Sequence, residues 1–256
     1  MLPRISIITP SYNQAQFIEK TVLSVVSQNY PNLEYIVMDG GSNDGTLEIL
    51  KKYKGKLLWF SQKDEGQSDA INNAMKKAKG EILGYLNSDD LLQPESLHEV
   101  AEYFQEYPKI SWVTGRCHMI DDKGELTRSC ITSYKNFWLK YCRTRNALAI
   151  LNFISQPATF WRREVVDKIG FFDRSLYYAM DYDYWLRLSK IYRLGFIDKH
   201  LASFRIHKVS KSRKNVKGLF SEGYQVAGRY INSPLIFLHK LHDILSILTY
   251  KLFYYE

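Results

Sequence analysis

The chain has 256 residues, and its 35 lysines and arginines outnumber 27 aspartates and glutamates, which gives a formal net charge of +8. Hydrophobic residues make up 45% of the sequence, enough to bury a core, so a predominantly disordered chain is excluded. Three cysteines without metal-ligand spacing exclude a disulfide scaffold and a zinc module, and the lack of an 18-residue apolar stretch predicts no membrane-spanning helix.

Strand and helix patterns alternate through the first hundred residues. Short apolar, β-branched runs predict strands, and apolar residues repeating every 3.6 positions predict amphipathic helices. The expected strands are 5–8, 33–38, 56–60 and 82–86, and the expected helices are 17–28, 47–53, 68–78 and 97–107, the last with Pro94 in its first turn. Because helical crossovers leave successive strands parallel, the predicted fold class is α/β with a largely parallel sheet.

The regular alternation ends after Pro108. Segments 110–120 and 125–132 flank an Asp-Asp-Lys-Gly turn signal and predict a β-hairpin. The remaining expected elements are a helix or helix plus loop over 136–153, a strand over 158–161, a helix over 176–189 and one or two strands over 194–206. A final helix over 234–255 would place Leu238, Leu241, Ile244, Leu245, Leu248 and Leu252 on one face.

Polar segments follow three of the predicted strands, at 9–13, 39–45 and 87–90. Ligands of open parallel sheets bind beyond the carboxyl ends of the strands, so these segments form the expected binding site. Adjacent carboxylates such as Asp89 and Asp90 repel each other unless a divalent cation lies between them and a ligand's phosphates. A cap for the helix near Pro94 is the alternative role of this pair, and the sequence leaves both open.

Two further carboxylate pairs are candidates for chemistry. Asp39 and Asp44 flank a Gly-Gly turn, where a carboxylate can accept hydrogen bonds from ribose hydroxyls or a base, although a helix cap explains Asp44 equally well. Asp181 and Asp183 begin a predicted helix. One of them can face the site as a general base while the other caps the helix or pairs with Arg187.

The segment 204–217 contains six lysines and arginines with hydroxyl residues between them. Together with the net charge of +8, this indicates anionic partners such as nucleic acid, an acidic membrane surface or phosphate-bearing substrates. Basic side chains with hydroxyls suit diphosphates or anionic lipid headgroups. The lack of interleaved aromatic residues disfavours nucleic acid, and a solvated surface is the remaining alternative.

Six motifs occur in a fixed order: ITPSYNQ (8–14), MDGGSNDGT (38–46), DEGQSDAIN (64–72), YLNSDD (85–90), SQPATFWRR (155–163) and MDYDYWLRL (180–188). Over roughly residues 4–212 the chain resembles the family-2 inverting glycosyltransferases with the GT-A fold. The resemblance implies a Rossmann-like sheet with helices on both faces. It also implies a nucleotide-sugar donor, usually a UDP-sugar, a divalent cation (Mn²⁺ or Mg²⁺), and transfer to an acceptor hydroxyl with inversion at the anomeric carbon.

The resemblance assigns roles to individual residues. Asp181 matches the catalytic base, Asp90 the direct metal ligand, and Asp89 a second metal ligand that also meets the sugar or ribose. Gln156 would border the acceptor and Trp185 the sugar. The residues implied to contact the donor are Thr9, Pro10, Ser11, Tyr12, Asp39, Asp44, Asp64, Gln67, Ser68, Asp69, Asn87, Asp89 and His207.

The chain departs from the family pattern at two places. Ala70-Ile71-Asn72 stands where the family often has Arg-Asn, so we expect the basic segment to supply the missing phosphate contact. Met180 replaces an acidic residue before Asp181, which removes a neighbouring carboxylate and leaves Asp183 as a competitor for the role of base.

The predicted function is therefore transfer of a hexose or N-acetylhexosamine to a glycan acceptor, lipid-linked through a polyprenyl diphosphate, in surface polysaccharide synthesis. A non-catalytic nucleotide-sugar-binding scaffold is the alternative, which Asp90 and Asp181 disfavour. We expect a glycosyltransferase domain over 1–215 and a helical extension over 216–256. The extension would contact the inner face of the cell membrane, or pack on the protein's own core or a second subunit in a homodimer, and the protein would be cytoplasmic.

Overall fold

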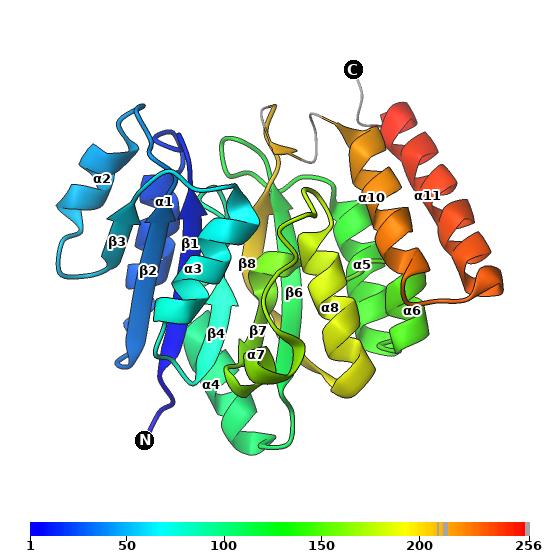
Figure 1. Ribbon diagram of the computed structural model, residues 1–256, viewed down its shortest axis with the longest axis horizontal. Coiled ribbons are helices and arrows are strands. Elements are labelled where there is room, and N and C mark those ends of the chain that lie inside the picture. Colours follow the sequence, from blue (N-terminus) through cyan, green and yellow to red (C-terminus); the bar gives the residue numbers. More distant parts are fainter. Residues whose placement is uncertain (209, 212–214, 254–256) are drawn as a thin grey trace.

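Eight strands form one sheet in the order β3-β2-β1-β4-β7-β6-β8-β5, with helices on both faces (Figure 1). The computed structural model describes residues 1–208, 210–211 and 215–253, and for 250–253 the backbone alone. The strands are β1 (Ile5–Ser11), β2 (Leu33–Asp39), β3 (Leu58–Ser61), β4 (Ile82–Tyr85), β5 (Leu91–Leu92), β6 (Trp112–Ile120), β7 (Thr159–Arg162) and β8 (Leu194–Arg205). The helices are α1 (Ile18–Val26), α2 (Thr46–Lys52), α3 (Gln67–Lys77), α4 (Ser96–Glu106), α5 (Ser129–Tyr141), α6 (Arg145–Ile150), α7 (Glu164–Ile169), α8 (Met180–Ile191), α10 (Val216–Gly228) and α11 (Ser233–Phe253), with one 3₁₀ turn, η1 (Gln156–Ala158).

The direction of the strands changes at the middle of the sheet. β1 to β4 run parallel, β7 is antiparallel to both of its neighbours, and β6 and β8 are parallel to each other. The short β5 pairs antiparallel with the end of β8, through Leu91 opposite Ser203. The predicted α/β class with a largely parallel sheet is confirmed.

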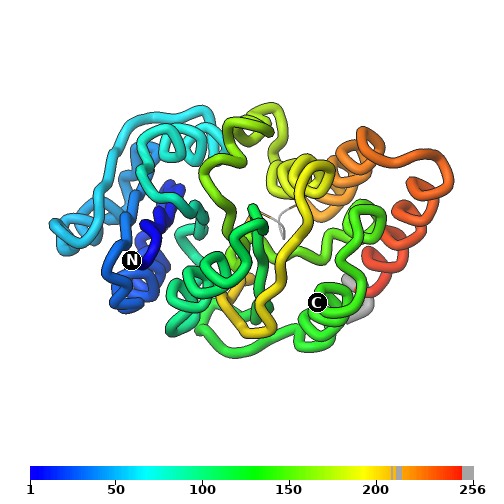
Figure 2. The backbone as a smooth tube through the Cα atoms, turned by 90° about the horizontal axis from the view of Figure 1, so that it is seen from below, coloured from blue at the N-terminus to red at the C-terminus, as the bar shows by residue number. Residues whose placement is uncertain are grey.

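Two hydrophobic cores lie on opposite faces of the sheet. Figure 2 shows the course of the backbone from below. One core joins the sheet to α1, α2 and α4, and the other joins it to α3, α6, α8 and α10. The apolar stripes read from the sequence supply these contacts, for example Ile18, Val22 and Val25 of α1, which are all fully buried. This three-layer arrangement leaves the loops at the strand ends to form a site.

Two predicted elements are wrong. The second arm of the expected hairpin is not a strand: only Leu126 forms a bridge, with Ile120, and α5 already begins at Ser129. Pro94 lies before α4 rather than in its first turn, because Glu95 adopts a left-handed conformation with φ of 62° and the helix starts at Ser96. The segment 194–206, left open as one or two strands, forms the single strand β8 with register shifts near Arg116 of β6.

The C-terminal helices pack on the main body. Val226 and Ala227 of α10 are fully buried in the core that contains α6 and α8. The polar side of α11 faces inward, since His239 is buried and its Nδ1 lies 2.8 Å from the carbonyl oxygen of Ala149. The division into 1–215 and 216–256 stays a prediction. Of the basic segment, residues 209 and 212–214, which include Arg213 and Lys214, lie outside the described residues.

Candidate functional site

The loops after β1 and β2 are joined by hydrogen bonds between backbone and side chain. Asn13 N donates to Ser42 Oγ at 2.8 Å, and Asn43 N donates to Asn13 Oδ1 at 3.0 Å. Ala15 N donates to Asp44 Oδ2 at 2.9 Å, and Asp44 also accepts from Thr46 at the start of α2. Asp44 thus stabilises the helix start, as the capping alternative requires, and also fixes the two loops as one surface.

Asp39 organises the Gly-Gly turn from inside. Its carboxylate is buried and accepts from Gly41 N, Ser42 N and Ser61 Oγ at 2.7–3.0 Å. Gly41 has a φ of 86°, a conformation that a side chain would strain, so the turn needs glycine there. The carboxylate points into its own loop, and contact with a nucleotide base would require some of these bonds to exchange.

The first predicted motif separates into buried and open residues. Thr9 is buried, with its Oγ1 3.1 Å from Tyr35 Oη, and Pro10 is buried in β1. Ser11 is also buried, and its hydroxyl has no hydrogen-bond partner among the described residues. Tyr12 is 61% exposed. Tyr12 is thus the residue of this motif whose side chain is open to a ligand.

A polar network surrounds Asn87 at the end of β4. Asn87 Oδ1 accepts from Gln67 Nε2 at 2.7 Å, and its Nδ2 donates to Asp90 Oδ2 at 3.1 Å and to Gln156 Oε1 at 3.2 Å. Gln156 in turn donates to the carbonyl oxygen of Tyr85 at 2.5 Å. Residues from three predicted motifs, far apart in the sequence, therefore meet at one strand end.

Asp89 meets His207 beside this network. Asp89 Oδ2 lies 2.9 Å from His207 Nε2. The contact follows from topology: β5, directly after the Asp-Asp turn, pairs with the end of β8, and His207 follows β8. Arg205 holds the turn in place, because its Nε donates to the Asp89 carbonyl oxygen at 2.8 Å and its guanidinium lies 5.2 Å from the ring centroid of Phe17.

Asp90 does not occupy the position that the sequence predicted. It is fully buried, its Oδ1 accepts from Arg205 N at 2.8 Å, and its Oδ2 accepts from Asn87. Burial, and next the charge of Asp89, raise the pKa of Asp90 well above its usual range. Both oxygens are engaged within the protein, so direct metal ligation by Asp90 is replaced by a positioning role. The capping alternative also fails, since Glu95 stands at the cap position of α4.

Asp181 stands at the first turn of α8, half-buried, with its Oδ1 accepting from Tyr182 N at 2.7 Å. Burial raises the pKa of Asp181, while the Tyr182 N–H and the charges of Lys135 and Lys211 oppose that shift. The pKa of Tyr85 is raised first by burial and then by the charges of Asp181 and Asp90. The charges of Asp181 and Asp90 therefore both act on the Tyr85 hydroxyl.

Asp183 is a structural residue. Its Oδ2 lies 2.8 Å from Arg187 Nε, which confirms the predicted i,i+4 pair, and its Oδ1 accepts from Tyr230 Oη at 2.7 Å. This leaves Asp181 as the only one of the two carboxylates without an ion pair among the described residues.

Trp185 does not border a sugar site. It is fully buried, stacked on Trp112 at 5.9 Å between ring centroids and edge-on to Trp161 at 5.7 Å. The prediction for Trp185 is wrong: it lies one turn beyond Asp181 along α8, at a level where the helix packs on Trp112 and Trp161 of the sheet.

The loop 64–69 is partly tied to its surroundings. Asp64 accepts from Gly66 N at 2.9 Å, and burial followed by the charges of Asp69 and Asp39 raises its pKa. Ser68 is buried, with its Oγ 2.7 Å from Met180 Sδ. Asp69 faces Arg174 Nε at 3.4 Å. Of the predicted donor residues in this loop, Gln67 is the one that reaches the Asn87 network.

The structure places three cations here, of which Lys211 and Arg205 belong to the predicted basic segment and Lys135 does not. Lys211 Nζ donates to Gln67 Oε1 at 3.0 Å and to the Tyr177 carbonyl oxygen at 2.8 Å, so the basic segment does bring one charge to the site. Lys135 of α5 donates to the carbonyl oxygen of Ile154, and burial lowers its pKa. Arg205, which also belongs to the basic segment, is engaged within the protein through the carbonyl oxygens of Asp89 and Asp121. No local pattern marks Lys135, whose place follows from packing of α5 on β6.

The side chains of Asp89 and His207 are suitable ligands for a divalent cation. One carboxylate and one imidazole face each other at 2.9 Å, and Mg²⁺ or Mn²⁺ at phosphate sites commonly takes few protein ligands and completes its shell with phosphate oxygens and water. Among the described residues no group of three or more histidine, cysteine or acidic side chains could enclose a metal. A cation held here would therefore depend on a bound diphosphate for further ligands.

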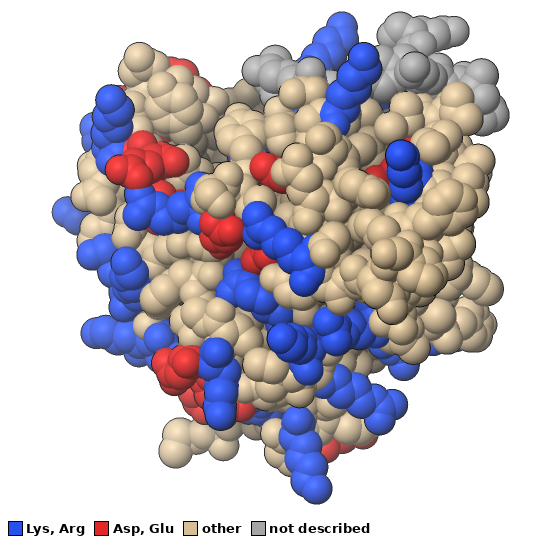
Figure 3. Space-filling view, turned by 45° about the vertical axis from the view of Figure 1, so that its right-hand side comes forward, with Lys and Arg blue, Asp and Glu red and all other residues tan. Residues whose placement is uncertain are grey.

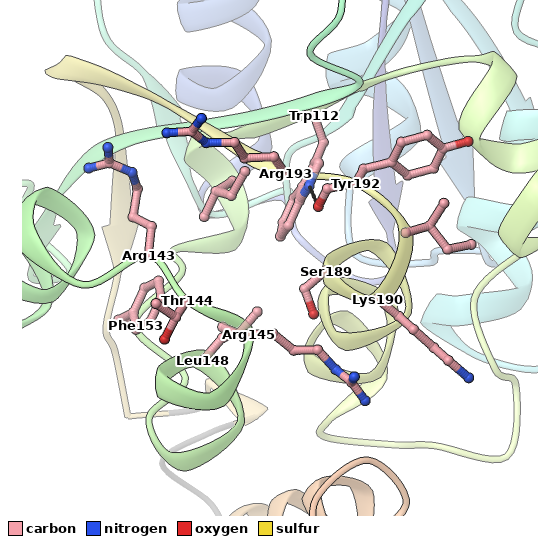
Figure 4. Close-up of a pocket in the computed structure, with 12 residues that line it drawn as sticks. Trp112, Arg143, Thr144, Arg145, Leu148, Phe153, Ser189, Lys190, Tyr192 and Arg193 are labelled. Carbon is pink, nitrogen blue, oxygen red and sulfur yellow. Dashed lines mark hydrogen bonds between the residues drawn. The ribbon is translucent and has the colours of Figure 1, made fainter.

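A separate cavity of about 250 Å³ lies at the other end of α8 (Figure 4). Arg143 and Arg193 extend to one side of it, and Arg145 and Lys190 to the other. Asp181 is in the first turn of α8 and Lys190 in the last, so a helix of about 1.5 Å rise per residue separates this cavity from the site by roughly 13 Å. The cavity is not part of the site described above.

Comparisons with known proteins show which family the chain resembles. The model of the family described as Glycosyl transferase family 2 matches residues 6–170. Chondroitin synthase of Escherichia coli is 28% identical over 253 residues, covering 93% of this chain and 35% of that protein. The putative teichuronic acid biosynthesis glycosyltransferase TuaG of Bacillus subtilis is 35% identical over 131 residues, covering 49% of this chain and 52% of that protein. The chain thus spans about a third to a half of these two relatives.

Solved structures show the same fold. The mannosyltransferase PcManGT from Pyrobaculum calidifontis, in complex with GDP-Man and Mn²⁺, aligns with a TM-score of 0.70 at 21% identity, over 95% of this chain and 69% of that one. S. aureus TarS 1–349 in complex with UDP-GlcNAc aligns with a TM-score of 0.68 at 21% identity, over 90% and 67%. The GT-A arrangement expected from the motifs is confirmed, and since the family model covers well over half of the residues, the chain belongs to glycosyltransferase family 2.

Proposed function

We propose that the chain transfers a hexose or N-acetylhexosamine from a nucleotide sugar to a hydroxyl of a glycan acceptor, with inversion at the anomeric carbon. Asp181 is the general base, and Asp89 with His207 faces the diphosphate. The proposal is supported above all by the polar network of Asn87, Gln67 and Gln156, with the Asp89–His207 contact on the same turn and Lys211, which bonds Gln67 and whose charge acts on Asp181. A scaffold that only binds nucleotide sugars has no need for a base across from the leaving group.

The transfer is a single displacement. The acceptor oxygen forms a bond to the anomeric carbon and gives its proton to Asp181, while the bond from that carbon to the diphosphate oxygen breaks on the opposite face. Asp181 must be ionised to accept this proton, and the positive charges of Lys135 and Lys211 favour that form. Attack from the face opposite the leaving group inverts the configuration.

Negative charge develops on the departing diphosphate as its bond to the sugar breaks. A divalent cation, Mn²⁺ or Mg²⁺, would be held by Asp89 and His207 and would supply Lewis-acid stabilisation of that charge when bound. Lys211, which already bonds Gln67, adds a positive charge on the same side and takes the place of the arginine missing at Ala70-Ile71-Asn72. Asp90 keeps the turn rigid through Arg205 N and Asn87.

The similar proteins support two classes of nucleotide-sugar donor and one class of acceptor. A UDP-sugar is supported by TarS, solved with UDP-GlcNAc, and a GDP-sugar would be the choice if the chain followed PcManGT. The matches to chondroitin synthase and TuaG support an acceptor in a surface polysaccharide, and the lipid-linked form remains the acceptor we propose.

The decisive experiment is an assay of sugar transfer with UDP- and GDP-sugars and glycan acceptors, in Mn²⁺ and in EDTA, with the product's anomeric configuration determined by NMR. We expect product only with one nucleotide class, with inverted configuration. Retained configuration would remove Asp181 from the role of base. Tight donor binding without transfer or hydrolysis would favour the scaffold.

A further inference from the structure

Helix α11 turns its apolar side to solvent. Six side chains on this side are between 44% and 66% exposed, and we call them the apolar face: Phe237, Leu238, Leu241, Ile244, Leu245 and Leu248. Five of them are among the leucines and isoleucine that the sequence placed on one helical face. Surface helices of globular proteins bury such a stripe, so this one has no partner within the described chain.

The orientation of α11 is fixed by polar contacts on its inner side. His239 is buried, its Nδ1–H donates to the Ala149 carbonyl oxygen at 2.8 Å, and its Nε2 lies 3.1 Å from Asp243 Oδ2. Tyr134 of α5 stacks on His242 at 6.2 Å between ring centroids. Turning the apolar face inward would break these contacts and leave buried polar groups unpaired, so the outward direction is a property of the fold.

An apolar groove runs beside this face, between α10 and α11. It has a volume of about 250 Å³ and is lined by Phe220, Tyr224, Ile244 and Ile247, with the polar residues Lys217, Ser221, Lys240 and Asp243 also along it. Figure 3, which brings the α10 and α11 side of Figure 1 forward, shows there a broad area with few charged residues. The groove and the apolar face share Ile244 and form one continuous surface.

The charges on this surface that are left without a partner among the described residues are positive. The acidic residues within the described part of α10 and α11 are Glu222 and Asp243. Glu222 accepts from the backbone N–H groups of three residues, Tyr177, Tyr178 and Ala179, and Asp243 pairs with His239. Lys217 and Lys240 have no ion-pair partner among the described residues. A second copy of a chain with net charge +8 would bring like charges together here, whereas an anionic surface complements them.

We propose that the α10–α11 surface docks on an anionic lipid bilayer. The apolar face enters the boundary between headgroups and acyl chains, the groove accepts an acyl or isoprenoid chain, and Lys217 and Lys240 contact headgroup phosphates. None of the described helices is long and apolar enough to cross a bilayer, so α11 lies in the plane of the interface. The proposal does not depend on which sugar or nucleotide the site uses.

The test measures co-sedimentation of the full chain with vesicles. Vesicles of phosphatidylglycerol with phosphatidylcholine should bind it, and phosphatidylcholine alone should bind it less. Leu241→Ser/Leu245→Ser should weaken partitioning about tenfold or more, since two half-exposed leucines lose their burial in lipid. Lys217→Gln/Lys240→Gln should weaken binding to anionic vesicles about tenfold and reduce its sensitivity to salt.

Matched controls distinguish binding through this surface from nonspecific adsorption to vesicles. Leu23→Ser/Leu58→Ser removes two equally exposed leucines from the opposite end of the sheet, and Lys54→Gln/Lys56→Gln removes two lysines near β3; both should bind vesicles like the parent. Melting temperature and turnover with a soluble acceptor should be unchanged in all four variants, which keeps the result separate from the proposed catalysis. Equal vesicle binding by Leu241→Ser/Leu245→Ser and its control would overturn the proposal. So would a dimer in lipid-free solution that the same variant dissociates, because the face would then belong to a second copy.

Discussion

The role of Asp181 is the sharpest prediction for a single residue. Asp181→Asn keeps the shape of the side chain but cannot accept a proton, so turnover should fall by about 10²–10⁴-fold while the donor still binds. The measurement is kcat together with donor affinity. Asp183→Asn is the matched contrast: it should lower the melting temperature through loss of the Arg187 and Tyr230 contacts and retain activity per folded molecule. Normal turnover in Asp181→Asn would reassign this residue to structure.

Lys135 gives a prediction about pH. Because burial raises the pKa of Asp181 and Lys135 opposes the rise, activity should be lost on the acid side as pH falls through that raised pKa. Lys135→Met removes the opposing charge, so the acid limb of the rate profile should move to higher pH. Lys140→Met on the same helix, where Lys140 pairs with exposed Asp198, should leave the limb in place. An acid limb that does not move in Lys135→Met would show that Lys135 has no influence on the base.

At the scale of elements, the attachment of α11 should depend on pH. Burial alone would lower the pKa of His239, but Asp243 and the Ala149 carbonyl outweigh it, and the pKa of His239 is raised. Despite burial, His239 and His242 lower the pKa of Asp243. The His239 contribution to stability is complete below its unfolded value of 6.5 and is lost as pH rises through the folded pKa. The Asp243 contribution is present above 3.8 and is lost in more acidic solution.

Hydrogen exchange of the α11 amides, corrected for intrinsic rates, should therefore be slower near pH 6 than at alkaline pH. His239→Gln should abolish this difference, whereas His98→Gln, on α4, should preserve it. The same pH response in the parent and in His239→Gln would disconnect this histidine from the docking of the helix.

Local pattern predicted most elements but failed where context decides. The run Leu126 to Thr132 has strand-forming residues, and β7 covers only Trp112 to Thr114 of β6. The run nevertheless pairs with the end of β6 only next to the Leu126–Ile120 bridge, because α5 begins three residues later. Whether residues of this kind form a strand depends more on packing against neighbouring strands than on their intrinsic preference. Here Ser129 begins a helix instead. The same limit applies to the site: motifs located Asn87, Asp89 and Asp181, but whether Asp90 or Asp89 is open depends on Arg205 N, more than a hundred residues away.

At the scale of the whole molecule, donor binding should raise the melting temperature. A ligand at about 100 times its dissociation constant adds about 2.7 kcal/mol of stability, which corresponds to a rise of roughly 5–10 °C for a domain of this size. The rise should need Mn²⁺ and disappear in EDTA. Asp89→Asn and His207→Gln should lose the Mn²⁺-dependent part of the shift. An undiminished shift in both variants would remove this pair from the metal site.

The antiparallel contact of β7 with β4 marks a seam in the molecule. Ile82 to Gly84 face Phe160 to Arg162 there. Apart from His207 and Lys211, the residues proposed to meet the nucleotide lie before β6 in the chain, while Asp181 and Gln156 follow β6. On the proposed roles, we expect the first stretch of sequence to supply most of the recognition of the leaving nucleotide and the second to supply recognition of the incoming hydroxyl. Chimaeras of related chains joined near Pro108 should inherit donor choice from one parent and acceptor choice from the other, so glycan diversity can arise by recombination within a single gene.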